Sequence, residues 1–359
     1  MELSKKQQEI VEATEPYIVI NSCAGSGKTR TLSERVKFLL LRGVPANKIV
    51  VITFTNAAAE TAMERIGNAP GLNCCTVHAY ANRLLLMAGV DTSKILNDED
   101  FDKLFMLVKQ HPECIQEVEY LLLDEGQDST SQQFEFMLDM VKPKNWMIFC
   151  DHRQSIYGFA GANPEHIIDL IHDPSVTVYD LDENYRNSPE ILDYAQSLIC
   201  KLGYDYEDFS VPMRKNIRGR VVNVDYSGEG IVTTIKRYVE QGRALYSDWF
   251  ILTRTNAESE DIMKVLARHK IPYDTFKKAQ LNSKGLEAKM KENTVKVLTI
   301  HTAKGLEAEN VIVIGARWHD AEECRINYVA ATRAKNLLVW TIKRAARKPS
   351  KIKTEHWGG

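Results

Sequence analysis

Short apolar runs alternate with helical patterns along this chain of 359 residues. Each run has the length of a buried strand and is bounded by turn residues, and the segments between runs carry apolar residues at helical spacing. The predicted strands are Tyr17–Asn21, Ile49–Thr53, Tyr120–Leu123, Trp146–Cys150 and Val176–Asp180, and then 221–224, 249–253, 295–300, 311–314 and 337–341. Strands that alternate with helices indicate an α/β fold with parallel, doubly wound sheets.

The alternation occurs in two series, which predicts two domains. A length of about 150 residues per domain agrees with this division. We place the boundary near Leu181, after the last strand of the first series, so the expected domains are residues 1–180 and 181–359. The basic stretch 275–293 has no strong apolar stripe, and we expect a short insertion or flexible connection there, on the second domain.

The composition is that of an ordinary globular protein, with 44% hydrophobic and 26% charged residues, which excludes disordered and collagen-like classes. No stretch reaches the roughly 18 uninterrupted apolar residues of a membrane span, and the N-terminal residues lack a signal-peptide core. The seven cysteines show neither paired spacing nor a histidine partner at zinc spacing, which favours reduced thiols. We therefore expect a soluble cytoplasmic protein without a membrane partner.

Charge is segregated along the chain. The total of 46 basic and 48 acidic residues gives a net charge of −2. Residues 1–180 carry 16 basic and 25 acidic side chains, a net of −9, whereas residues 181–359 carry 30 and 23, a net of +7. A basic half is compatible with a face that binds a polyanion, although charge alone is explained as well by a solvated surface.

A glycine-rich segment, Ser22–Thr29, lies between a predicted strand and a predicted helix, as a phosphate-binding loop requires. Its glycines let backbone N–H groups converge on phosphate oxygens, and Lys28 supplies a positive charge for the β and γ phosphates. Thr29 is expected to hold magnesium through its hydroxyl. Ser22 replaces the first glycine of the strict pattern, so a plain strand-to-helix turn is the alternative. The loop predicts ATP and Mg²⁺ as ligands, bound by Ala24, Gly25, Ser26, Gly27, Lys28 and Thr29.

Two adjacent acids, Asp124 and Glu125, follow the apolar strand 120–123. Successive side chains that leave a strand point in different directions, so Asp124 can reach magnesium while Glu125 faces an attacking water. Acids at strand ends also serve as helix caps. Together with the phosphate-binding loop, however, the pair predicts ATP hydrolysis.

These two sites belong to an ordered set of motifs. The set consists of Leu3-x-x-x-Gln7, GSGKT, Thr53–Asn56, Thr76-x-His78, DEGQD at 124–128, Asp151-x-x-Gln154-Ser155-Ile156-Tyr157, Asn184-Tyr185-Arg186, Thr299–Glu307 and Ala331–Ala334. In number and order the motifs resemble those of the UvrD/Rep-type superfamily 1 DNA helicases over about residues 3–339. The resemblance implies two tandem RecA-like P-loop NTPase domains and a DNA-dependent ATPase that translocates on single-stranded DNA and unwinds duplexes, with 3′ to 5′ polarity.

The resemblance also implies roles around the nucleotide. Gln7, Arg30 and Tyr185 match residues near the adenine, and Glu307 matches a further nucleotide contact. Gln154 matches a sensor of the γ-phosphate, while Arg186 and Arg333 match arginines that reach that phosphate from the second domain. The expected catalytic residues are therefore Lys28, Glu125, Gln154, Arg186 and Arg333. An arginine contact of this kind is worth about 10³ to 10⁵ in rate.

A second group of residues is expected to contact the strand, because sequence-independent binding needs aromatic faces for bases and donors for phosphates. Phe54, Tyr157 and Phe159 match base-stacking aromatics, with core packing as the alternative for the two phenylalanines. The residues in segments that match backbone contacts are Thr55, Asn56, Thr76, His78, Thr299 and His301. A structural role is the alternative for the two histidines.

Some positions depart from the family pattern. Ala57 and Ala160 stand where lysine and arginine are usual, which puts two DNA contacts in doubt, and Gly126 replaces a small alanine or cysteine with little expected effect. The gaps that usually hold accessory insertions are short, at 79–119 and 275–293. We therefore expect a compact motor that translocates well and unwinds weakly alone.

Three other functions fit parts of the pattern. They are an RNA helicase, the motor subunit of a nuclease or repair complex, and a DNA-binding scaffold with a degenerate nucleotide site. The intact catalytic positions disfavour degeneracy, whereas stacking and phosphate contacts accept DNA and RNA alike. The expected partners are single-stranded DNA, single-strand/duplex junctions and a repair, replication or recombination protein. The chain is expected to act as a monomer associated with the nucleoid.

Overall fold

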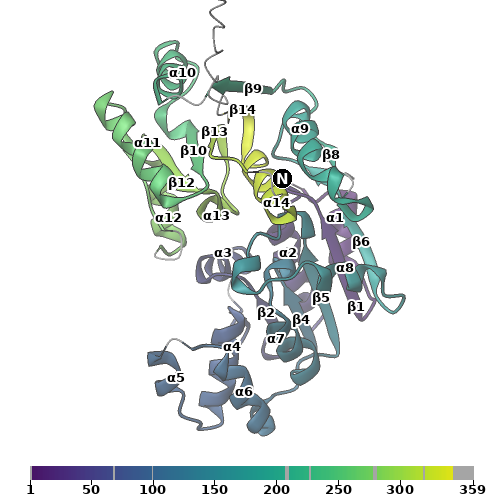
Figure 1. Ribbon diagram of the computed structural model, residues 1–359. Helices are drawn as coiled ribbons and strands as arrows, with labels where there is room; N and C mark the ends of the chain where they lie inside the picture. The colour runs from purple at the N-terminus through teal and green to yellow at the C-terminus, as the bar shows by residue number, and fades with distance from the viewer. Residues whose placement is uncertain are drawn as a thin grey trace, which may run out of the picture.

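Two parallel sheets form the centres of two lobes, stacked one above the other in Figure 1. The computed structural model describes residues 2–67, 69–98, 100–206, 210–225, 228–277, 281–317 and 320–342. The first sheet has the strand order β3-β2-β4-β5-β1-β6, and the second has the order β11-β12-β10-β13-β14-β9. All strand pairs in both sheets are parallel. The α/β fold with two tandem RecA-like lobes is confirmed.

The first sheet comprises β1 (Tyr17–Ser22), β2 (Ile49–Ile52), β3 (Asn73–Cys75), β4 (Tyr120–Leu123), β5 (Asn145–Cys150) and β6 (Thr177–Leu181). The second comprises β9 (Arg220–Asp225), β10 (Trp249–Thr253), β11 (Tyr273–Asp274), β12 (Val295–Thr299), β13 (Ala308–Ile314) and β14 (Ala334–Ile342). Every predicted strand is present. The sequence missed β3, β11 and the short pair β7 (Glu183–Asn184) and β8 (Val211–Pro212), because two or three residues show no period.

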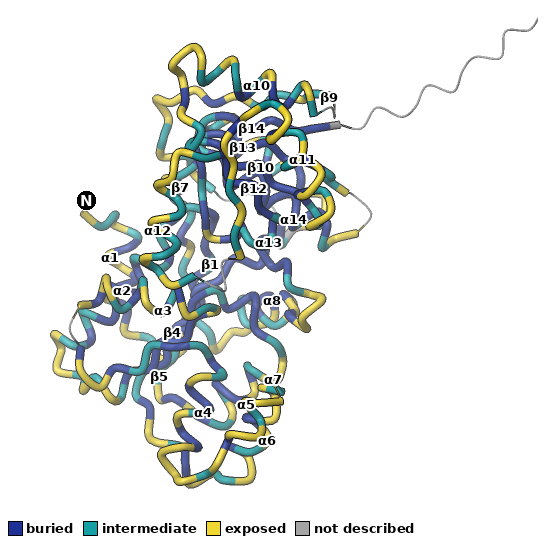
Figure 2. Tube along the Cα trace, turned by 90° about the vertical axis from the view of Figure 1, so that its left-hand side faces the viewer, coloured by how far each residue is buried: buried dark blue, intermediate teal, exposed yellow. Residues whose placement is uncertain are grey.

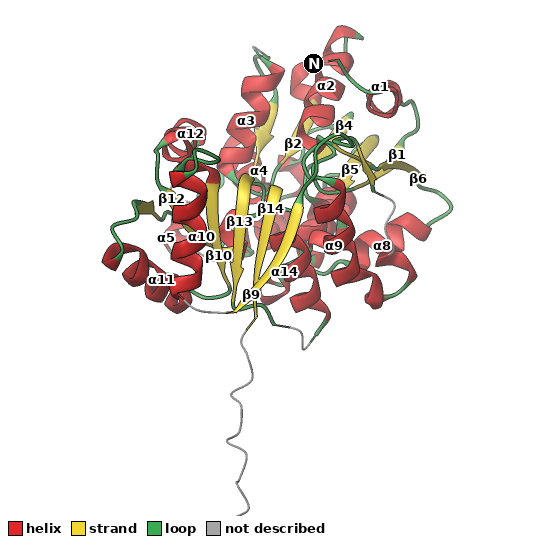
Figure 3. Ribbon diagram, turned by 90° about the horizontal axis from the view of Figure 1, so that it is seen from above, coloured by secondary structure: helices red, strands yellow, loops and turns green. Residues whose placement is uncertain are grey.

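Helices cover both faces of each sheet. In the first lobe these are α1 (Lys5–Glu12), α2 (Lys28–Leu41), α3 (Asn56–Ile66), α4 (Val77–Met87), α5 (Ser93–Asn97), α6 (Lys103–Gln110), α7 (Ser131–Phe134) and α8 (Glu165–His172). In the second they are α9 (Pro189–Ile199), α10 (Gly228–Glu240), α11 (Asn256–Arg268), α12 (Ser283–Lys291), α13 (Ile300–Ala303) and α14 (Ala321–Ala331). Figure 3 shows α10 and α11 on one side of the second sheet and α9 and α14 on the other.

The central strands of each sheet are buried on both faces, which explains why their sequences are continuously apolar. All four residues of β2 and all five of β10 are buried. In Figure 2 the buried trace follows the sheets, and the exposed trace follows helix surfaces and loops. No helix in the described part of the chain is long and apolar enough to cross a membrane.

The structure overturns one expectation, that Gly126 matters little. Gly126 is buried at the start of the turn after β4, and a Cβ atom there would lie 2.5 Å from Cγ2 of Ile148 and 3.4 Å from Cδ1 of Ile167. Ile148 is fully buried in β5, and its β-branched side chain has little freedom to turn away. The glycine is therefore required by packing between β4 and β5.

We expect Gly126→Ala to lower the free energy of unfolding by about 1–3 kcal/mol, as overpacking of a close-packed core does. Urea denaturation measures the change. Ile148→Leu, which removes the branch at Cβ, should recover part of the loss in the double variant. Strict additivity of the two substitutions would contradict the proposed clash.

Candidate nucleotide and nucleic-acid site

A cavity of about 860 Å³ lies between the two lobes and is lined by both. Its walls include many of the residues singled out from the sequence, namely Gly25, Ser26, Gly27, Lys28, Thr29, Arg30, Phe54, Thr55, Asp124, Glu125, Tyr157, Tyr185, Arg186, His301 and Glu307. Residues from opposite ends of the chain thus meet in one cleft.

The phosphate-binding loop connects β1 to α2. Gly25 and Gly27 have φ values of 69° and 83°, a region that favours glycine. A Cβ on Gly25 would lie 2.6 Å from Cβ of Arg186, so this glycine also permits close approach of the second lobe. The Asn184 amide donates to the carbonyl of Ala24 over 2.7 Å, and the Tyr185 N–H donates to that of Gly25 over 3.0 Å.

Ser22, the departure from the strict loop pattern, has a structural explanation. Its hydroxyl is buried and donates to the Cys150 carbonyl over 2.5 Å. Because this bond joins the ends of β1 and β5, the serine fixes the strand from which the loop begins. The substitution therefore leaves the loop geometry intact.

Thr29 and Asp124 face each other at the base of the cleft. The Thr29 hydroxyl donates to Oδ2 of Asp124 over 3.0 Å. Burial and, to a smaller extent, the neighbouring Glu125 charge raise the pKa of Asp124 to about 6. An oxygen pair in which one member is a carboxylate suits Mg²⁺, whose charge would favour the ionised form. These residues fit the predicted metal site.

Glu125 carries the opposite shift. Burial alone raises its pKa, but the charges of Lys28 and Lys304 lower it to about 2. Nζ of Lys28 lies 3.9 Å from Oε1 of Glu125, and the Gln127 amide donates to Oε2 over 2.6 Å. Glu125 is thus ionised at neutral pH and oriented by a fixed donor, as a base that accepts a proton from water must be.

The two predicted arginines occupy different positions. Arg186 lines the cavity, where its Nε donates to Oε2 of Glu307 over 2.6 Å. Arg333 is 1% exposed and does not line the cavity; its Nη2 donates to Oε1 of Gln154 over 2.9 Å. Gln154 is likewise buried, at 4% exposed. The predicted sensor and one predicted arginine therefore contact each other directly behind the cavity wall.

The residues expected near the adenine flank the loop. Gln7 is buried beside it, and its amide donates to the Ser26 carbonyl over 3.1 Å. Arg30 and Tyr185 line the cavity, and the Tyr185 hydroxyl donates to Glu183 over 3.0 Å.

Four rings form a cluster, and three of them, Phe54, Tyr157 and His301, line the cavity. The ring centroids of Phe54 and Tyr157 are 4.8 Å apart, those of Tyr157 and Phe159 are 5.9 Å apart, and those of Phe159 and His301 are 5.5 Å apart. Phe54 is 42% exposed and Phe159 is 75% exposed, so neither is a core residue. The exposed faces of Phe54 and Phe159, both in the first lobe, offer stacking surfaces for bases.

The predicted backbone-contacting residues divide into two sets. Thr55, Thr76 and Thr299 are the N-caps of α3, α4 and α13, each accepting a bond from a backbone N–H, and Asn56 is the first residue of α3. His78 instead stacks on Phe105 of α6, with centroids 5.2 Å apart, and burial lowers its pKa. This environment favours the structural interpretation of His78.

The sequence analysis did not predict a second loop that resembles the loop containing Phe54. Residues 253–257 (TRTNA) repeat the pattern of residues 53–57 (TFTNA), and β10 lies between β12 and β13 in its sheet, as β2 lies between β3 and β4 in the first. The Thr53 hydroxyl donates to the Thr55 carbonyl over 3.0 Å, and that of Thr253 donates to the Thr255 carbonyl over 3.1 Å. The internal repeat was the signal that could have found it.

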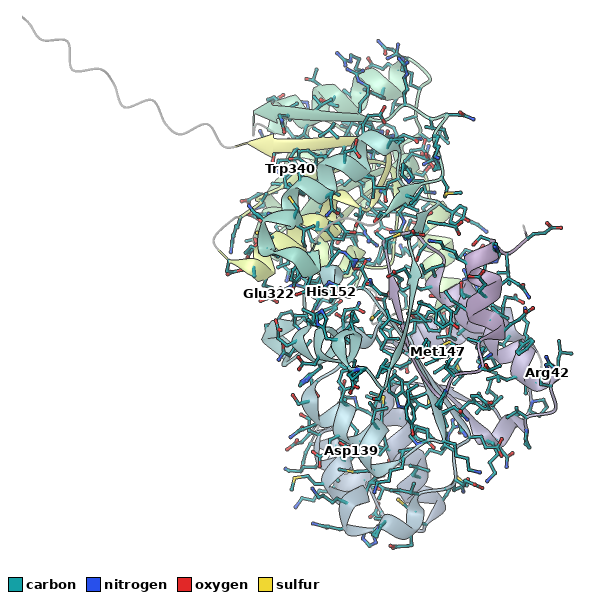
Figure 4. The ribbon with its side chains drawn as sticks, turned by 90° about the vertical axis from the view of Figure 1, so that its right-hand side faces the viewer. Arg42, Asp139, Met147, His152, Glu322 and Trp340 are labelled. Carbon is teal, nitrogen blue, oxygen red and sulfur yellow. The ribbon has the colours of Figure 1, made fainter. Side chains whose placement is uncertain are left out.

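The sequence analysis also did not predict the side-chain contacts that join the two lobes. Nζ of Lys304 donates to Oδ2 of Asp128 over 2.5 Å and to the Gln154 carbonyl over 2.6 Å. Nε of Arg325 donates to the Ser155 carbonyl over 2.7 Å. The second lobe therefore holds the segment that runs from Gln154 to Tyr157. Figure 4 shows His152 and Glu322 at this junction.

A phosphate-binding loop faced across a cleft by a second RecA-like lobe defines a two-lobed P-loop NTPase. The chain matches the family described as UvrD/REP helicase N-terminal domain over residues 3–112 and 92–175. It matches the UvrD-like helicase C-terminal domain over residues 179–284 and 275–345. The chain belongs to the UvrD/Rep helicase family.

Among its curated relatives, the chain is 28% identical to the ATP-dependent DNA helicase PcrA of Leuconostoc citreum, over 76% of this chain and 49% of PcrA. It is 26% identical to the ATP-dependent DNA helicase Rep of Escherichia coli (strain K12), over 76% of this chain and 55% of Rep. A probable DNA helicase of Mycoplasma pneumoniae is 25% identical, over 94% of this chain and 82% of that protein. The chain thus spans about half the length of PcrA and Rep.

The junction contains a titratable group, His152. It is buried, and its Nε2 lies 2.5 Å from the Asp205 carbonyl, whereas Nδ1 has no hydrogen-bond partner. Burial lowers its pKa to about 4 from the ordinary 6.5. Protonation would place a charge and an unpaired N–H in this contact.

Because the folded state favours neutral His152, its contribution to stability should be complete above pH 6.5 and lost as the pH falls toward 4, where the unfolded chain takes the proton first. The expected slope is about 1.4 kcal/mol per pH unit over that range. Urea unfolding at several pH values should show a shallower slope for His152→Gln. Parallel profiles for the two proteins would contradict this assignment.

Proposed function

We propose that this chain is a motor that hydrolyses Mg-ATP in the interdomain cleft, translocates 3′ to 5′ along single-stranded DNA and unwinds duplex DNA. The observation that carries the proposal is the shared cavity, in which the phosphate-binding loop and Arg186 lie near the stacking residues Phe54 and Tyr157. Residues 1–180 and 181–359 are the proposed moving units.

The residues of the cleft supply the parts that phosphoryl transfer needs. Mg²⁺, held by Thr29 and Asp124, would neutralise charge on the phosphates. Lys28 provides a positive charge from the first lobe, and ionised Glu125 accepts the proton of the attacking water. Arg186 provides a charge from the second lobe once its guanidinium turns from Glu307 toward the γ-phosphate.

The buried contacts of Gln154 connect the nucleotide site to the residues proposed to bind the strand. Gln154 is held by Arg333 and Lys304, and Tyr157 lies three residues further along the same segment. When the lobes close or open, a shift of this segment changes the position of the aromatic cluster. Phe54 of the first lobe and His301 of the second would then grip and release the strand at different stages.

The short stretch 79–119 supports a partner for unwinding. Among its described residues it contains only α5, α6 and most of α4 as helices longer than one turn. We propose that a repair, replication or recombination protein, or a nuclease subunit, engages the duplex while this chain pulls the strand.

Duplexes with a single-stranded 3′ or 5′ tail test the motor directly. We expect ATP-dependent unwinding of the 3′-tailed substrate, and ATPase activity that single-stranded DNA stimulates more than RNA of equal length. Arg186→Ala should lower kcat by about 10³ or more, because the cation from the second lobe is lost.

Arg268→Ala, at an exposed end of α11, is the matched control and should retain full activity. A kcat for Arg186→Ala within tenfold of the unaltered chain would contradict the cleft mechanism. Preference for a 5′ tail would contradict the polarity, and stronger stimulation by RNA would favour an RNA helicase.

A substitution at Phe159 tests the proposed strand-binding surface. It should change the free energy of unfolding little, because the Phe159 side chain is 75% exposed. Phe159→Ala should weaken binding of single-stranded DNA by about 1–3 kcal/mol, the contribution of one stacked base. Fluorescence anisotropy of a labelled oligonucleotide measures this loss.

Leu41→Ala is the control, since Leu41 is 87% exposed at the end of α2. Both variants should unfold at the same urea concentration as the unaltered chain. Equal affinities for all three proteins would remove Phe159 from the strand-binding surface.

A further inference from the structure

Helix α12 extends from the second lobe to α3 of the first. The Ser283 N–H donates to Oε2 of Glu60 over 2.8 Å, and the Ser283 hydroxyl donates to Oε1 of Glu64 over 3.1 Å. On its other side, α12 packs Leu286 and Met290 against the core of the second lobe. Both Figure 1 and Figure 2 show α12 above α3. The helix is thus fixed to one lobe and bonded to the other. We call the contacts of Ser283 with Glu60 and Glu64 the clasp.

The clasp lies over the cavity. Ala57, Thr61 and Arg65 recur every four residues, so they share one face of α3, and all three line the cavity. Leu286 of α12 and Lys277, which precedes the helix, line the same cavity from the second lobe. The aromatic residues Phe54 and Tyr157 belong to this cavity as well. It therefore has a stacking wall and a wall formed by α3 and α12.

Two cations face this space from opposite lobes. Arg65 and Lys277 are exposed, and neither has an ion-pair partner among the residues that the structure describes. The nearest acids on α3, Glu60 and Glu64, are instead engaged by Ser283. Unpaired cations opposite stacking rings are the arrangement that a single strand requires, with its bases on one side and its phosphates on the other.

We propose that α12 closes a channel around a single nucleic-acid strand, in which Arg65 and Lys277 contact the sugar-phosphate backbone and the Ser283 contacts with Glu60 and Glu64 close the ring. The proposal rests on the strand-binding function proposed above and adds that the protein encloses the strand. An enclosed strand leaves by sliding to an end, whereas a circular strand leaves only when the clasp opens.

A topological experiment tests the ring. Ser283→Cys and Glu64→Cys are combined with Cys200→Ser, because Cys200 is the exposed one among the seven free cysteines. The protein is loaded on circular single-stranded DNA at low salt, crosslinked with a short bis-maleimide and moved to high salt. We expect the crosslinked protein to retain the circle and to release a linear strand of equal length.

The controls separate the two proposals. The single-cysteine variants should release the circle at high salt, and protein crosslinked before loading should fail to retain it. Release of the circle by protein crosslinked after loading would overturn the channel, since the strand would then lie outside the clasp. Absence of binding at low salt, before any crosslink, would instead overturn the strand-binding function itself.

Salt dependence tests the two cations. Each phosphate contact contributes about 0.7 to the slope of log affinity against log salt for a single strand. Arg65→Ala and Lys277→Ala should each lower the slope by about that amount. Lys94→Ala, on exposed α5 at the far end of the first lobe, should leave it unchanged. Unchanged slopes for both cavity variants would overturn the assignment of Arg65 and Lys277 to the backbone.

Discussion

The carboxylates of Asp124, which is buried, and of Glu125, which is partly buried, set the electrostatic requirement of the site. An ionised acid taken out of water is costly unless cations compensate it. The first lobe supplies Lys28, and the other charges that lower the pKa of Glu125 are Lys304 and Arg333 of the second lobe. The charge of Glu125, the proposed proton acceptor, is therefore stabilised by side chains of both lobes.

The same contacts extend toward the aromatic cluster. Lys304 binds Asp128 and the Gln154 carbonyl, and its ammonium lies 5.1 Å from the centroid of the Tyr157 ring. One side chain of the second lobe thus touches the segment after Asp124 and Glu125 and the ring proposed to stack on a base. Coupling between sites needs such a contiguous set of contacts with two arrangements. In the proposed motor, those arrangements are the closed and open cleft.

The sequence was informative where a signal is local. Apolar runs located every long strand, and the glycine pattern located the loop with the φ values that it requires. The space around Gly126 was not predictable, because Ile148 is distant in sequence and close only in the fold. The helix α12 was missed since Leu286 and Met290 alone make no apolar stripe. The burial of Arg333 behind Gln154 likewise depends on how two lobes meet.

The repeated loops at Thr53 and Thr253 show how one scaffold presents two different side chains. Both loops follow corresponding strands, and both threonines at the third position cap the next helix. The second position differs, since Phe54 offers an aromatic face and Arg254 is paired with Glu323 over 2.8 Å. The guanidinium of Arg254 is thus committed to an ion pair within its own lobe, whereas the ring of Phe54 stays available to a base, so the repeated scaffold presents different chemistry in each lobe.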